Sequence, residues 1–131
     1  MTRTPHMLVL ILTVTLTLGI AASATAAGPA VTQVVAVDTN GDTDALLADA
    51  KSNAKIFERL GIQATRRYMQ ATLAGSESGT IAVVIDYPSL AALAAAQEKL
   101  RNDPEWQKYI EKINKSGMSV QSNSVWVDMT P

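Results

Sequence analysis

Residues 80–89 of the chain are TIAVVIDYPS, and this stretch decides the fold. Its first eight residues are mostly apolar on both alternating faces, which is typical of a strand buried on both sides. Pro88 stops the strand and Ser89 is a favoured helix N-cap. An apolar stripe at steps of three and four then predicts a helix, with Gln97 beside the stripe: Leu90, Leu93, Ala96 and Leu100.

The same strand-then-helix pattern precedes this stretch. Residues 31–38 (VTQVVAVD) are valine-rich and lie between Pro29 and Asn40-Gly41, so they are predicted to form a strand. Asp42 is the expected N-cap of a helix over residues 43–60, which Gly61 ends. The expected apolar face of this helix consists of Leu46, Leu47, Ala50, Ala54, Phe57 and Leu60.

The remaining segments complete the pattern. Residues 64–73 (ATRRYMQATL) predict a strand with Met69, Ala71 and Leu73 on one face, and residues 75–79 a hairpin loop. Asp103-Pro104 restarts a helix that ends at Ser116-Gly117, and its expected buried edge is Trp106, Ile110 and Ile113. Residues 118–129 predict the last strand.

The order β-α-β-β-α-β predicts an α+β, ferredoxin-like fold, with a four-stranded antiparallel sheet and helices on one face. Strands 31–38 and 80–87 are the more apolar, which fits the two central positions of such a sheet. The helices cover one sheet face only. A second copy of the chain is the simplest cover for the other face, so we expect a homodimer.

Residues 1–26 have the layout of a secretory signal peptide. Arg3 precedes an apolar run over residues 7–22, and Ala24-Thr25-Ala26 is an A-x-A cleavage site. An uncleaved membrane anchor is the alternative, but two overlapping cleavage signals favour removal. We therefore expect one domain over residues 27–131 in an exported protein, periplasmic or extracellular, with no membrane association after cleavage.

Cleavage would remove His6, the only histidine, and the chain has no cysteine. Haem, zinc and copper sites built on histidine or cysteine are therefore not expected, and no cofactor or metal is predicted. Residues 27–131 keep all 12 acidic residues and all basic residues but Arg3, a net charge of −2. This balance gives no electrostatic reason to expect nucleic acid or an anionic membrane as a partner.

Several short motifs resemble one protein superfamily: Arg59-Leu60-Gly61, Arg66-Arg67, Ala74-Gly75, Tyr87-Pro88-Ser89 and Asp103-Pro104-Glu105-Trp106. Together they are similar to the dimeric α/β-barrel superfamily, in particular its NIPSNAP-like and antibiotic-biosynthesis-monooxygenase-like branches, over residues 31–128. The resemblance implies two ferredoxin-like subunits packed sheet to sheet, with a ligand pocket between each sheet and its helices. The monooxygenase branch binds aromatic substrates without a cofactor, using Asn, Trp and Tyr groups.

The residues predicted to bind a ligand are Arg66, Tyr68, Gln70, Tyr109 and Trp126, and no catalytic residue is assigned. Arg66, Tyr68 and Gln70 form a polar row that is either a solvated edge or an anion-binding row, in which Arg66 and Tyr68 hold a carboxylate. An ion pair with Asp86 or Asp128 at the dimer interface is a further alternative for this row, and Arg66 and Arg67 lie on opposite faces of one strand. Trp126 is expected at the dimer seam or in a pocket, and Trp106 in the core.

Three functions fit these observations. The first is a non-enzymatic, exported homodimer that binds a small apolar or aromatic molecule. The second is a cofactor-independent monooxygenase or isomerase that acts on an aromatic or polyketide-like compound. The third is a structural or stress-associated protein without a ligand. The missing histidine favours binding, because the commonest general base is absent.

Overall fold

The computed structural model describes residues 28–72, 75 and 79–131. The signal-peptide prediction and the middle of the predicted hairpin loop lie outside the described residues. The elements are β1 (Val31–Asp38), α2 (Thr43–Arg59), β2 (Thr65–Gln70), β3 (Ile81–Tyr87), α3 (Leu90–Arg101), α4 (Pro104–Lys115) and β4 (Ser119–Val127). This is the predicted α+β, ferredoxin-like arrangement.

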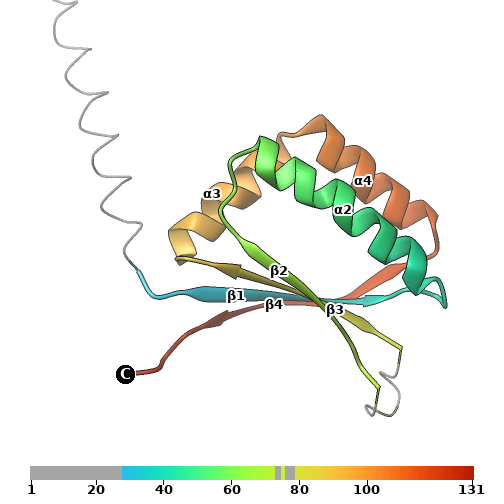
Figure 1. Ribbon diagram of the computed structural model, residues 1–131, viewed down its shortest axis with the longest axis horizontal. Coiled ribbons are helices and arrows are strands. Elements are labelled where there is room, and N and C mark those ends of the chain that lie inside the picture. The colour runs from blue at the N-terminus through green and yellow to red at the C-terminus, as the bar shows by residue number, and fades with distance from the viewer. Residues whose placement is uncertain (1–27, 73–74, 76–78) are drawn as a thin grey trace, which may run out of the picture.

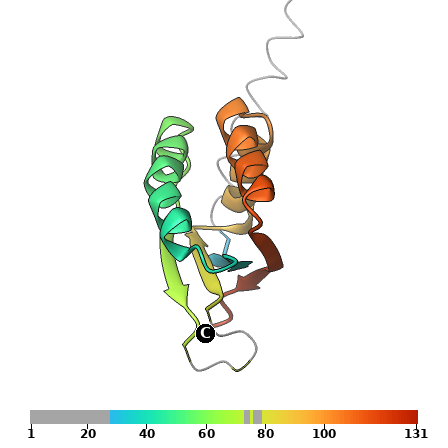
Figure 2. The same cartoon turned by 90° about the vertical axis from the view of Figure 1, so that its right-hand side faces the viewer.

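The four strands form one antiparallel sheet in the order β2-β3-β1-β4, so β1 and β3 are central as predicted. The helices all lie on one face of this sheet (Figure 1). Seen end-on, α2 forms one arm above the sheet, and α3 and α4 form the other (Figure 2). None of the helices in the described residues lies on the opposite sheet face, which we call the open face.

Each helix begins at the N-cap that the sequence predicts. Asp42 accepts a hydrogen bond from the N–H of Ala45 at 3.1 Å, and Ser89 from that of Ala92 at 3.0 Å. Asp103 caps α4 by accepting from the N–H of Trp106 at 2.9 Å. These side chains satisfy N–H groups that a helix start leaves without partners, which explains why the helices begin there.

The core lies between the helices and the helix-facing side of the sheet, in two clusters. One joins β1, β3, α2 and α3 around Val31, Ile56, Phe57, Ile85, Tyr87, Leu93, Ala96 and Leu100. The other lies at the far end of the sheet around Val37, Leu46, Ile81, Ile113 and Met118. Burial of such side chains is worth about 1.5–3 kcal/mol each, so these clusters hold the two layers together.

Some predicted core positions are wrong. Leu47 is 42% exposed and Ala54 is exposed, because α2 turns Asn53 and Ile56 toward the sheet in their place. Leu90 lies in the first turn of α3 and is 55% exposed. Ile110 is 40% exposed, because α2 and α4 are not closely packed along their length.

Candidate functional site

A cleft of about 440 Å³ lies between the helix-facing side of the sheet and the three helices. Alternate residues of the strands form its floor, and α2, α3 and α4 form its walls. The lining residues share an apolar or aromatic character with a few polar groups: Gln33, Val35, Val37, Leu46, Asn53, Phe57, Arg66, Tyr68, Val83, Ile85, Tyr87, Gln97, Leu100, Arg101, Trp106, Tyr109, Ile110, Ile113, Val120 and Asn123.

A β-bulge shapes one side of the cleft floor. Ala36 pairs with Ser122 but Val37 pairs with Val120, so β4 has one extra residue at this point. The extra residue places Asn123 and Val120 on the same sheet face although they are three apart in sequence. Gln33 Nε2 on β1 donates to Asn123 Oδ1 at 3.0 Å and fixes the two amides across the floor.

Three aromatic rings form a continuous cluster on the cleft walls. Trp106 meets Phe57 edge-on at a centroid distance of 6.1 Å and Tyr109 in a tilted contact at 5.2 Å. Phe57 comes from α2, and the other two come from α4. Rings at these separations attract one another and present flat, rigid surfaces to a ligand.

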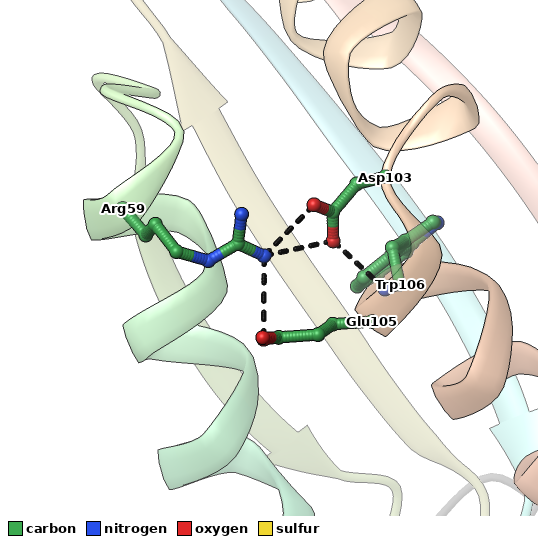
Figure 3. A network of polar contacts seen from close by, with 4 residues as sticks. All are labelled: Arg59, Asp103, Glu105 and Trp106. Carbon is green, nitrogen blue, oxygen red and sulfur yellow. Dashed lines mark hydrogen bonds and ion pairs between the residues drawn. The ribbon is translucent and has the colours of Figure 1, made fainter.

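An ion-pair network ties the two helical arms at one end of the cleft (Figure 3). Arg59 Nη2, at the end of α2, donates to both carboxylate oxygens of Asp103 at 2.8 and 2.9 Å and to Glu105 Oε2 at 3.2 Å. Burial alone would raise the pKa of Asp103, but hydrogen bonds from Arg59 and from the Trp106 N–H outweigh burial, and the pKa is lowered. Asp103 therefore joins Arg59 on α2 to the first turn of α4, which carries Trp106.

Arg66 brings a positive charge to the cleft from β2. Its guanidinium carbon lies 4.0 Å from the centre of the Phe57 ring, a cation–π contact. Within the described part of the chain, no carboxylate forms an ion pair with Arg66. Arg66 and Arg101 are the charged residues among the described lining residues, and both are cations.

Three phenols surround this charge. Burial raises the pKa of Tyr68, Tyr87 and Tyr109, and the positive charge of Arg66 acts in the opposite direction on all three. For Tyr109 a hydrogen bond with the Asn53 side chain also lowers the pKa, but burial outweighs it. The three phenols are therefore protonated at neutral pH, so each can donate a hydrogen bond.

Asn53 is a buried polar residue on the cleft wall. It is 4% exposed, and its Oδ1 atom has no hydrogen-bond partner, the one such buried side-chain atom among the residues described. A buried acceptor without a partner costs free energy, and native proteins rarely keep one without a reason. The wall of the cleft therefore contains a residue whose buried acceptor has no partner within the described part of the chain.

The family of the chain follows from its sequence: residues 40–131 match the NIPSNAP family model. The chain belongs to the NIPSNAP family. Two crystal structures of NIPSNAP family proteins from Agrobacterium tumefaciens strain C58 have the same fold. One, at 15% identity, has a TM-score of 0.59 and covers 78% of this chain and 88% of its own. The other, a protein of unknown function at 16% identity, has a TM-score of 0.57 and covers 79% and 93%.

No curated protein matches this NIPSNAP chain. The described residues contain no group of three or more His, Cys, Asp or Glu side chains that could hold a metal ion. None of the described helices is both long enough and apolar enough to cross a membrane. The described cleft lining offers aromatic rings, arginines and amides to a ligand.

The structure brings together three of the five residues predicted to bind a ligand. Arg66, Tyr68 and Tyr109 all line the cleft. Gln70 follows on the same sheet face as Arg66 and Tyr68 but is exposed and does not line it. Trp126 lies on the open face, where it is 65% exposed and donates to Ser124 Oγ at 3.0 Å, so it is absent from the cleft.

Two other predictions from the sequence have clear outcomes. Arg66 and Arg67 do face opposite sides, and it is Arg67 on the open face that forms an ion pair with Asp86, at 3.0 Å and within one chain, while the dimer-interface ion pair stays a prediction. Trp106 packs against the core cluster as predicted, but it is half-buried and also lines the cleft.

Asn53 and Phe57 were missed as site residues. Asn53 lies seven residues after Leu46 and four before Phe57, so it shares their helix face. A polar residue inside an apolar stripe was the signal that could have identified it. Gln33 gave the same signal inside the valine-rich first strand, where it is buried.

Proposed function

We propose that this NIPSNAP protein is an exported homodimer that binds a small apolar or aromatic molecule in the cleft, without catalysing a reaction. The observation that carries the binding proposal is the unpartnered Asn53 Oδ1 in a wall of aromatic and aliphatic side chains. Ligand sites in proteins are mostly apolar concavities of roughly 300–1,000 Å³ with a few well-placed polar groups, and the cleft has this composition and size.

The absence of a proton acceptor favours binding over catalysis. A monooxygenase or isomerase without a cofactor needs a group that removes a proton from its substrate. No carboxylate or histidine lines the cleft within the described ranges. The phenols of Tyr68, Tyr87 and Tyr109 have raised pKa values, and arginine is always charged, so none of these residues is a base at neutral pH.

The open face supports the homodimer. Val84 is 4% exposed at its centre, while Met69 is 51% exposed and Trp126 65% exposed toward its edges. Sheets commonly pack face to face at about 10 Å, with the side chains of both inner faces interlocking. A second copy placed in this way would bury Met69 and Trp126 of both subunits.

Export is proposed from the leader pattern of residues 1–26. Expression of the full chain in a bacterial host, followed by N-terminal sequencing of the exported fraction, tests it. A start at Ala27 is the expected result. A protein that keeps residues 1–26 and stays with the cells would contradict it.

Fluorescence of the neutral apolar probe N-phenyl-1-naphthylamine tests ligand binding at the cleft. Ile110 and Leu47 form a matched pair, because both are helical aliphatic residues with 40% and 42% exposure, but only Ile110 lines the cleft. We expect Ile110→Trp to reduce probe binding by blocking the cleft, and Leu47→Trp to leave it unchanged. No binding by the wild type, or equal binding by both variants, would overturn the proposal.

A further inference from the structure

We infer that the cleft takes an amphipathic monocarboxylic acid, with its carboxylate at Arg66 and its apolar body against the rings of Phe57 and Trp106. This inference rests on the proposed function, which gives only an apolar or aromatic ligand. It adds the charge of the ligand and the residue that binds this charge. It is argued from the charged residues in and around the cleft and from their partners.

The first step is the unbalanced positive charge of the cleft. Arg66 lies over the Phe57 ring, and none of the described carboxylates pairs with it. Asp49 on α2 is close enough to Tyr109 to raise its pKa, and Lys112 binds the Oδ1 atom of Asp49 at 2.7 Å. Partial removal of water from a charged group is costly without a partner. A ligand anion would supply that partner.

The second step is the geometry of the donors. A guanidinium is a planar fork that binds a carboxylate through two parallel hydrogen bonds. Tyr68 lies on the same face of β2 as Arg66, two residues along the strand. Tyr87 and Tyr109 are close enough to Arg66 for its charge to act on their pKa values. Hydroxyl donors around a guanidinium suit the remaining lone pairs of a carboxylate.

The number of cations in the cleft limits the negative charge that its ligand can carry. Apart from Arg66, the described lining has one charged residue, Arg101, which is exposed on α3. One cation over an aromatic ring balances one negative charge. A phosphate monoester would bring a second charge among side chains such as Val83, Ile85 and Trp106, and the exposed Arg101 is the one further cation in the described lining that could balance it. The cleft therefore fits a monoanion.

Titration calorimetry with matched probe pairs tests the inference on the protein produced from the full chain. The pairs are 2-naphthoate with 2-naphthamide, and decanoate with decanamide, which have the same shape with and without charge. Naphthyl phosphate is the dianionic comparison. We expect the wild type to bind at least one acid about tenfold tighter than its amide, since a hydrogen bond to a charged group is roughly twice as strong as one between neutral groups.

Arg67 gives a matched control, because it is the next residue on the same strand and faces the other way. Arg66→Gln should reduce the acid-to-amide ratio to about one, whereas Arg67→Gln should leave the ratio unchanged. Arg66→Lys keeps the charge without the planar fork and should keep part of the preference. If Arg66→Gln does not fold, the acid-to-amide affinity ratios of the wild type and of Arg66→Lys still test the inference.

The outcomes separate two kinds of failure. Equal binding of acid and amide by the wild type, a preference that survives Arg66→Gln, or tighter binding of naphthyl phosphate overturns the inference and leaves the proposed function standing. No binding of any member of either pair, together with no binding of N-phenyl-1-naphthylamine, overturns the proposed function itself. An acid preference that depends on Arg66 and not on Arg67 supports both.

Discussion

Asn53 is the residue at which the stability of the free protein and its ligand binding are expected to conflict. Its amide is 4% exposed, and Oδ1 has no hydrogen-bond partner. Leucine has the same branching and the same number of side-chain heavy atoms as asparagine, but no polar atoms. Asn53→Leu should therefore stabilise the protein and, because it removes the acceptor offered to a ligand, weaken the binding of any ligand that donates a hydrogen bond there.

The magnitude follows from two opposing terms. A buried acceptor without a partner costs about 1–3 kcal/mol, which the substitution recovers. Loss of the hydrogen bond with Tyr109 subtracts about 0.5–1.5 kcal/mol. The expected net change in the free energy of unfolding is a gain of about 1 kcal/mol. For a domain of this size, that gain raises the Tm by about 4–8 °C.

Asn114→Leu is the matched control, because Asn114 is an exposed helical asparagine on α4. Leucine has a higher helix propensity than asparagine by a few tenths of a kcal/mol, and this gain is common to both variants. Differential scanning calorimetry should therefore show a larger rise in Tm for Asn53→Leu. An Asn53→Leu variant that melts at or below the Tm of Asn114→Leu would refute the reasoning, because the amide would then have its partners in the free protein.

Three further predictions concern the contacts that hold the molecule together. Arg59→Gln should lower the affinity for N-phenyl-1-naphthylamine several-fold and change Trp106 fluorescence, because it removes the ion pairs that join the end of α2 to the start of α4; unchanged binding would mean that these ion pairs do not set the width of the cleft. The lowered pKa of Asp103 means that its stabilising effect is complete above about pH 4 and is lost as the pH falls through the folded-state value, so Asp103→Asn should melt with a weaker pH dependence than the wild type between about pH 5 and 2. Trp126→Asp, at a side chain that is 65% exposed on the open face, should give a folded monomer by native mass spectrometry where the wild type gives a dimer; an intact dimer would place the interface elsewhere.

The fold was predictable because its local signals agree with one another. Valine-rich runs at residues 31–38 and 80–87 became the two central strands, and Asp42, Ser89 and Asp103 cap the three helices. Each signal depends on neighbours in sequence, such as a period of two in a strand or an oxygen three residues before an N–H. Such signals need no knowledge of how the layers pack.

The site was harder to predict, because it depends on the spacing between layers. The stripe of α4 predicts a buried Ile110, but burial there requires α2 to lie close, and the cleft keeps the two helices apart. Asn53 breaks the apolar pattern of α2, and such a break has no meaning until the structure shows that no partner meets it. The polar row of Arg66 and Tyr68 had two interpretations, and only the sheet's orientation places it under the helices.

Side chains alternate along β2 between the cleft, where we propose ligand binding, and the open face, where we propose subunit pairing. Arg66 faces the cleft beside Phe57, and Arg67 faces the open side, where it pairs with Asp86. Because side chains alternate strictly, a shift of one residue in the pairing of β2 with β3 would send each arginine to the other face. The cleft would then receive Arg67 in place of Arg66, and both the contact of Arg66 with the Phe57 ring and the ion pair of Arg67 with Asp86 would be lost. The β2–β3 register is thus a requirement shared by ligand binding and subunit pairing, which makes β2 the element where a single change affects both.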